Sequence, residues 1–163
     1  MNIENILLSG GVLRFHNVPG LKCQTVADHS WGTAMLIDYL HGDAPKRLML
    51  SALTHDCALL ETGDIPESAK WKDPTLHIST NDIAEGVNKA WGIHSKLTIA
   101  EERILEVCSA LESVRYCVSR FHCGERAALK PLHEYKQHLI SVLTMESLER
   151  EYLVGLLSEV ENY

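Results

Sequence analysis

The stretch Thr54-His55-Asp56-Cys57 is followed closely by Glu61-Thr62-Gly63-Asp64-Ile65-Pro66. Apolar residues at helical spacing lead into it, and a glycine and a proline end the helical pattern behind it. His55 and Asp56 offer a nitrogen and a carboxylate from a single point in the chain. The same pair is also common at an ordinary helix end that reaches solvent. The rest of the sequence is therefore needed to decide between a pair of ligands and a helix end.

Length and composition are those of one globular domain. The 163 residues can bury most of their apolar surface in one domain, whereas two would both be small, so we expect one domain over 1–163. With 15 basic and 22 acidic residues the net charge is -7, which argues against a nucleic-acid partner, because the phosphate backbone needs a basic face.

Cysteine usage and hydropathy indicate the compartment. The five cysteines are odd in number and irregularly spaced, and no N-terminal run resembles a signal peptide, so we expect a cytoplasmic protein. No stretch approaches the roughly 20 apolar residues that a spanning helix needs, so we expect no membrane partner.

Helical periodicity runs through most of the chain. It predicts helices at about 26–40, 45–56, 79–91, 98–123, 132–145 and 148–160. Thr98 and Glu101 form a capping box at the start of the fourth helix. The region 63–78 shows little regular pattern and is predicted to be a loop. No segment alternates with period two for long enough to predict a strand, so the predicted fold class is all-α.

The helix at 26–40 carries a histidine in its first turn. Apolar residues at three- and four-residue spacing, among them Ala34, Met35 and Trp31, predict its buried face, and we expect Trp31 in the core. His29, taken alone, is more often a surface or packed core histidine than a ligand. Its pairing with a second histidine and an aspartate favours a ligand.

Three segments together resemble the HD-domain phosphohydrolases. They are Gln24-Thr25-Val26-Ala27-Asp28-His29-Ser30-Trp31, then His55-Asp56, and then Thr62-Gly63-Asp64-Ile65-Pro66 with Lys70. The resemblance runs from about Arg14 to about Gly124 and is strongest to the bacterial 5'-deoxynucleotidases and the short phage dATP triphosphohydrolases. It implies a single-domain HD-type helical bundle that assembles as a homo-oligomer.

The resemblance implies a metal site made by His29, His55 and Asp56. Imidazoles and a carboxylate suit a divalent transition metal such as Mn, Co, Zn, Fe or Ni better than calcium. The set contains no cysteine, which argues against a closed structural zinc site. Such a metal would activate a water for attack on phosphorus and polarise a phosphoryl oxygen.

The resemblance also implies the substrate contacts. Arg14 and Lys70 would hold phosphate, since a guanidinium binds it bidentately and an ammonium adds a point charge. Phe15 would lie against the nucleoside, and Asp64 near the sugar. On composition alone, Arg14 and Lys70 could equally be solvated charges, and Phe15 a core residue.

Two positions depart from the family pattern, and the first concerns the metal. The family usually completes its ligands with an aspartate in a later helix, and Ser109 occupies that place here. A neutral hydroxyl is a poor ligand for a divalent ion. Glu112 and Glu106 lie three residues away on the same helical face, and we expect Glu112 to replace the missing carboxylate. The alternative is that both lie on a solvated face.

The second departure concerns acid–base catalysis. The family places a glutamate four residues after the histidine of its HD pair, and that residue is Leu59 here. We expect Glu61 or Asp64 to act as the catalytic acid–base group instead. The loss of such a group typically costs about 10²- to 10⁴-fold in rate.

These residues predict a metal-dependent phosphohydrolase that cleaves the 5' phosphoester of a deoxynucleotide. Chain length favours the phage type, a dATP or dNTP triphosphohydrolase that releases a deoxynucleoside and triphosphate. A 5'-deoxynucleotidase acting on monophosphates is one alternative. Because of Ser109 and Leu59, a non-catalytic nucleotide-binding protein with a degenerate metal site is another.

Overall fold

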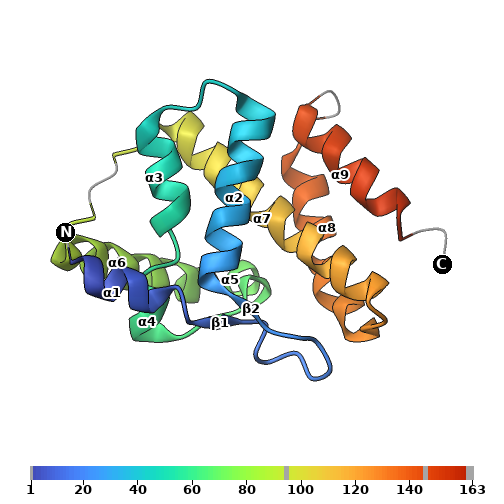
Figure 1. Cartoon of the computed structure of the whole chain (residues 1–163), viewed down its shortest axis with the longest axis horizontal. Helices are drawn as coiled ribbons and strands as arrows, with labels where there is room; N and C mark the ends of the chain where they lie inside the picture. The colour runs from blue at the N-terminus through green and yellow to red at the C-terminus, as the bar shows by residue number, and fades with distance from the viewer. Residues whose placement is uncertain (1, 94–95, 145–146, 161–163) are drawn as a thin grey trace.

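The computed structural model describes residues 2–93, 96–144 and 147–160, and these form a helical bundle around one long helix. That helix, α7 (Ile99–His122), packs against α2 (Val26–His41) and α8 (Leu129–Val142), as Figure 1 shows. The other elements are α1 (Ile3–Ser9), β1 (Leu13–Arg14), β2 (Gln24–Thr25), α3 (Lys46–Thr54), α4 (Leu59–Thr62), α5 (Glu67–Lys72), α6 (Pro74–Trp91), a 3-10 helix η1 (Arg126–Ala128) and α9 (Leu148–Ser158).

The predicted all-α class is confirmed. The largest fully buried apolar side chains come from α7 and from four helices that pack against it: Ile37, Leu48, Leu111, Leu139 and Leu153. The two strands form a short antiparallel ladder that pairs Arg14 with Gln24. Each strand has only two residues, too few for an alternating pattern to appear in the sequence.

Helix α2 turns a different face to the core from the predicted one. Trp31 is 63% exposed, so the prediction that it lies in the core is wrong. The buried face carries Ile37 together with His29 and Thr33, both of which have no exposed surface. Since α2 has apolar residues on both sides, periodicity could not identify the inner side. That side also contains polar residues, of which His29 is hydrogen-bonded to Glu112 and Ser109 of α7.

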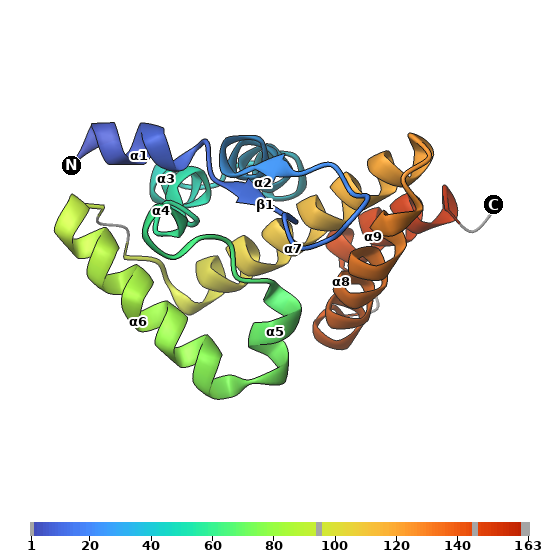
Figure 2. The ribbon, with the colours of Figure 1, turned by 90° about the horizontal axis from the view of Figure 1, so that it is seen from below.

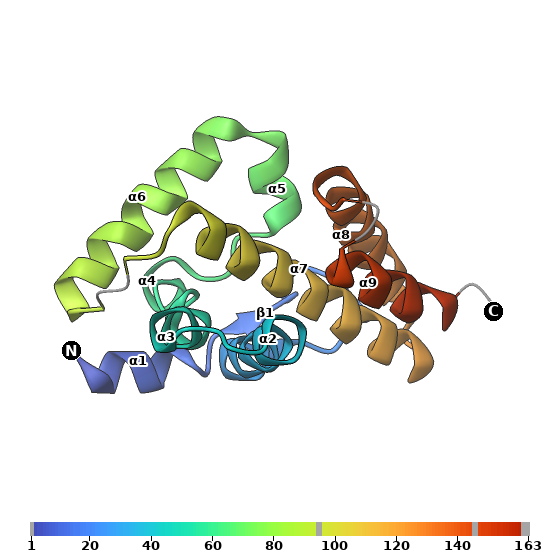
Figure 3. The same cartoon turned by 90° about the horizontal axis from the view of Figure 1, so that it is seen from above.

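The prediction of a loop at 63–78 is also wrong. Six residues form α5, and α6 begins at Pro74 because the side chain of Asp73 accepts the N–H groups of Thr75 and Leu76. Proline in the first helical turn fits this start, because its missing N–H needs no partner there. Figures 2 and 3 show α6 along the outside of the bundle, with α5 close to α8.

The other predicted helices agree with the structure to within a few residues. The capping box of Thr98 and Glu101 at the start of α7 is present. Helix α8 ends at Val142, and residue 145, the predicted end, lies outside the described residues. Helix α3 ends at Thr54, so the HD pair lies in the turn that follows it. In the described part of the chain, no helix is long and apolar enough to cross a membrane.

Candidate metal centre

Two histidines and an aspartate meet between α2 and the turn after α3. One ligand atom each from His29, His55 and Asp56 lies within 4.8 Å of the others. The Nε2 atoms of both histidines are 3.7 Å from Oδ2 of Asp56. Ligand atoms around a tetrahedral zinc ion, with bonds of about 2.0–2.2 Å, lie roughly 3.4 Å apart. The three residues therefore fit one divalent ion. Among the described residues, no other group of histidine, cysteine, aspartate or glutamate side chains has ligand atoms this close together.

Hydrogen bonds on the far side of each ring aim both Nε2 atoms at this cluster. Nδ1 of His55 lies 2.8 Å from the carbonyl oxygen of Ala52, and Nδ1 of His29 lies 2.5 Å from Oε2 of Glu112. Each Nδ1–H donates to its oxygen, which leaves the Nε2 lone pair for a metal. Burial and the Arg14 guanidinium lower the pKa of His29 well below its ordinary value, so its ring is neutral.

Asp56 is the anionic member of the cluster. Burial raises the pKa of its carboxyl, but attraction by His55 and Arg14 outweighs this and holds the pKa well below its ordinary value. Nε of Arg14 lies 3.6 Å from Oδ2 of Asp56. The cluster thus presents two imidazole nitrogens and a carboxylate, the donor set that first-row divalent metals take.

The structure does not bring Glu112 together with the ligand atoms. Its carboxylate has no exposed surface and lies behind His29, on the Nδ1 side of the ring. It also accepts hydrogen bonds from Nε2 of Gln24, at 3.0 Å to each oxygen, and from Arg115 at 2.7 Å. This position fits a group that orients a ligand, and it rules out the solvated face considered for Glu112. Glu106 is exposed and faces His138 at 3.5 Å.

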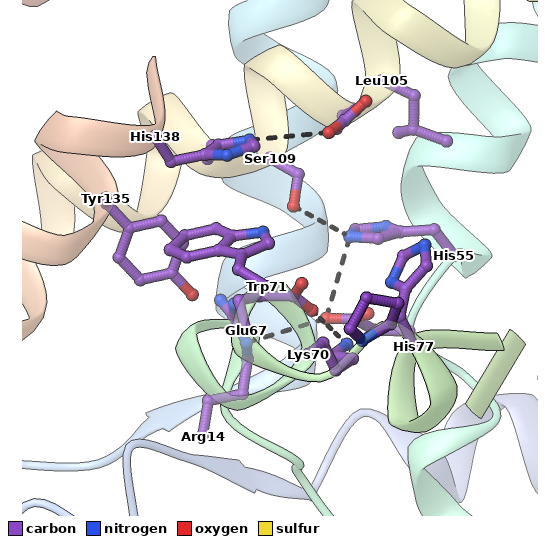
Figure 4. A pocket seen from close by; sticks show the side chains of 14 residues that line it. Arg14, His55, Glu67, Lys70, Trp71, His77, Leu105, Ser109, Tyr135 and His138 are labelled. Carbon is purple, nitrogen blue, oxygen red and sulfur yellow. Dashed lines mark hydrogen bonds and ion pairs between the residues drawn. The ribbon is translucent and has the colours of Figure 1, made fainter. Parts of the chain in front are cut away.

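Ser109 faces the cluster, as the family register predicts. Its Oγ lies 3.1 Å from Nε2 of His29 and 3.4 Å from Nε2 of His55, a contact drawn in Figure 4. A hydroxyl thus stands where the family has a carboxylate. Three protein ligands with a further position open to water are typical of catalytic zinc sites, whereas structural sites are closed by four.

The cluster opens into a pocket of about 430 Å³ that also contains both predicted phosphate cations. Figure 4 shows Arg14 and Lys70 lining it with His55. Arg14 donates to Gln24 at 3.1 Å and to Ser113 at 3.3 Å. Its Nε is buried and makes no hydrogen bond to any described residue. One guanidinium N–H beside the cluster is therefore available to a ligand.

A smaller pocket of about 140 Å³ adjoins the first and contains Phe15 and Asp64. The N–H of Phe15 donates to Oδ2 of Asp64 at 3.1 Å, and its ring stacks on Tyr116 with centroids 5.6 Å apart. Phe15 has φ of 60°, a left-handed conformation that costs a bulky residue about 1 kcal/mol. Strained residues of this kind cluster at functional sites, and they persist only where the surrounding contacts maintain them.

The two predicted catalytic carboxylates lie apart from each other. Asp64 lines the smaller pocket, and burial raises its pKa despite the Arg14 charge and the Phe15 N–H. Glu61 is exposed on α4 and is not among the residues that line either pocket. Leu59 lines a neighbouring pocket of about 210 Å³ with His55 and Asp56, and its apolar side chain can transfer no proton there.

Sequence reasoning missed Glu67, which lines the main pocket from α5 (Figure 4). It forms an ion pair with Lys70. Their spacing of three residues, typical of paired charges on one helical face, was the available signal, but the segment was predicted to be a loop.

The whole chain is similar to a solved phage enzyme. The HD phosphohydrolase DatZ of cyanophage S-2L, in a structure bound to dA and one catalytic Zn²⁺ ion, superposes with a TM-score of 0.75 at 18% identity. The alignment covers 100% of this chain and 98% of that one. No protein-family model and no curated protein matches the sequence. At this identity the likeness concerns the fold, and it confirms the predicted HD-type helical bundle.

The close approach of α2 to α7 predicts opposite effects for two glycine substitutions. A Cβ at Gly32 would lie 2.7 Å from Cγ of Glu112, whose hydrogen bonds hold it in place, whereas a Cβ at Gly86 meets nothing within 4 Å. We expect Gly32→Ala to lower the free energy of unfolding by about 1–3 kcal/mol. Gly86→Ala should raise it by about 0.5–1 kcal/mol. Urea denaturation checks this, and equal effects would refute the packing argument.

Metal affinity should follow the assigned geometry. His55→Ala removes a ligand, so we expect Zn²⁺ affinity to fall by more than the roughly 10- to 100-fold that loss of a group supporting a ligand causes. Ser109→Asp adds a carboxylate beside both Nε2 atoms and should tighten binding. The exposed His133→Ala is the matched control and should change nothing. Competition titration with a chromophoric chelator measures all three, and full affinity in His55→Ala would contradict the ligand set.

Proposed function

We propose that this protein is a metal-dependent phosphohydrolase that cleaves the 5' phosphoester of a deoxynucleotide. The observation that carries the proposal is a single pocket lined by the His55 and Asp56 ligands and by two cations, Arg14 and Lys70. Ligands for a metal and donors for phosphate are the two requirements of phosphoryl transfer to water. The HD-type fold, and the deoxynucleoside and zinc of its phage neighbour, support the same assignment.

We propose Mn, Fe, Co, Ni or Zn as the metal, held by His29, His55 and Asp56. The bound ion would supply Lewis acidity toward water and toward a phosphoryl oxygen. Arg14 would donate its free Nε–H to the phosphate, and Lys70 would add a positive charge across the pocket. Because hydrogen bonds to Gln24 and Ser113 position Arg14 before substrate arrives, Arg14 can stabilise negative charge that develops on the phosphoryl oxygens at little reorganisation cost.

We place the nucleoside toward the smaller pocket. Phe15 would lie along the base or sugar, and Asp64 would accept a hydrogen bond from the sugar hydroxyl with the oxygen that Phe15 does not use. Arg14 is the cation that lines both pockets. Its position fits a phosphate bound at the junction of the two pockets.

Within this proposal we favour a triphosphate substrate, giving a deoxynucleoside and triphosphate. The support is chain length, since the phage neighbour is matched over nearly its whole length. Monophosphate hydrolysis by a 5'-deoxynucleotidase is the alternative, and its products are a deoxynucleoside and phosphate. The homo-oligomer and the cytoplasmic location expected from the sequence stay predictions.

Ser109 and Leu59 give a specific reason to keep a non-catalytic alternative. A site that lacks the family's fourth ligand and its acid–base glutamate could retain a nucleotide without cleaving it. This alternative requires nucleotide binding that survives removal of metal by a chelator.

The function is tested by incubating the protein with each deoxynucleoside mono- and triphosphate in the presence of Mn²⁺, Co²⁺ or Zn²⁺. We expect metal-dependent release of a deoxynucleoside, abolished by EDTA and restored by the ion, because the metal activates the attacking water. Chromatography of the phosphate product separates triphosphate from phosphate release. Binding without turnover on any nucleotide, unaffected by EDTA, would establish the non-catalytic alternative.

A further inference from the structure

The junction between the two pockets contains a carboxylate to which no role has yet been given. Arg14, Tyr135 and Glu67 are the residues that line both the 430 Å³ pocket and the 140 Å³ pocket. If phosphate binds on the metal side and the nucleoside on the other, the scissile bond between phosphorus and O5' crosses this junction. The side chains at the junction are therefore those best placed to act on the leaving oxygen.

We propose that Glu67 is the proton donor to the 5' oxygen, a role that rests on the proposed function. The other carboxylates near the cluster or in the main pocket are engaged elsewhere. Glu106 lines the 430 Å³ pocket away from the junction and faces His138 at 3.5 Å. Asp56 is a ligand, Glu112 is buried behind His29, and Asp64 accepts the N–H of Phe15 in the smaller pocket. Glu67 also lines the neighbouring pocket in which Leu59 lies, so it reaches the region that the apolar residue leaves without an acid.

Tyr135 is the other protic group at the junction, and it is poorly suited to this step. Burial raises the pKa of its hydroxyl above the ordinary value. A group that holds its proton so tightly is a weak general acid near neutral pH, because catalysis is most efficient when the pKa of the acid is close to the operating pH.

The ion pair with Lys70 explains how Glu67 would acquire a proton. In the structure the Lys70 ammonium forms an ion pair with the Glu67 carboxylate and balances the negative charge of that carboxylate. A bound phosphate would attract Lys70 and leave Glu67 facing a second negative group. A nearby like charge favours the protonated form of a carboxyl group, so substrate binding itself prepares the acid.

The oxygen of a water bonds to phosphorus while the bond between phosphorus and O5' breaks, and its electron pair goes to O5'. The carboxyl proton of Glu67 moves to O5' and gives a free 5' hydroxyl. Both protons of the water stay with the phosphate product, which returns one to the Glu67 carboxylate as it leaves.

Glu67→Gln tests the step with two substrates that differ in one atom. One is the deoxynucleotide that the wild-type protein hydrolyses, and the other is its analogue with sulfur in place of O5'. A thiolate leaves readily without a proton, whereas the 5' alkoxide does not. We expect Glu67→Gln to lower kcat/KM by about 10²- to 10⁴-fold on the oxygen ester and by less than about tenfold on the sulfur analogue.

The ratio of the two rates is independent of how much of the variant is folded, so instability cannot imitate this result. Glu85→Gln, an exposed glutamate of α6, is the matched control and should leave both rates unchanged. Equal losses on both substrates, or no loss on the oxygen ester, would overturn the role of Glu67. If wild-type protein hydrolyses neither ester, the proposed function itself fails, and this is visible before any variant is made.

Discussion

A buried contact between Glu112 of α7 and His29 of α2 joins the two helices at the centre of the bundle. A carboxylate without exposed surface is tolerated only when its oxygens are satisfied, and here the donors come from α2, β2 and α7 itself. The contact fixes the packing of the two helices that meet at the centre of the bundle. It also fixes the tautomer and direction of the first histidine ligand.

The same network extends from His29 to Arg14, the proposed phosphate-binding cation. The amide nitrogen of Gln24 donates to Glu112, and its amide oxygen accepts from Arg14. Arg14 is therefore positioned by the carboxylate that positions His29. The short pairing of β1 with β2 serves this link, because it holds Arg14 opposite Gln24. The proposed metal ligand His29 and the proposed phosphate donor Arg14 are thus parts of one buried hydrogen-bonded unit.

Sequence reasoning located residues that lie within local motifs and missed relations that only the fold creates. It found His55 because the HD pair and its following loop are contiguous. It placed Glu112 on the face of Ser109, but spacing does not show how deeply a face is buried, and carboxylates usually stay in water. Trp31 was misplaced because polar residues fill the inner face of α2. Glu67 was missed because a helix of six residues gives too few repeats to detect.

The position of a bound metal is the most direct check on the ligand set His29, His55 and Asp56. Anomalous X-ray diffraction at the absorption edge of the ion, on crystals of metal-loaded protein, would show its position without reference to activity. This ligand set predicts about one ion per chain, between the Nε2 atoms of His29 and His55 and the carboxylate of Asp56, at roughly 2.0–2.2 Å from each. An ion bound elsewhere in the pocket, or no ion at these residues in fully loaded protein, would contradict it.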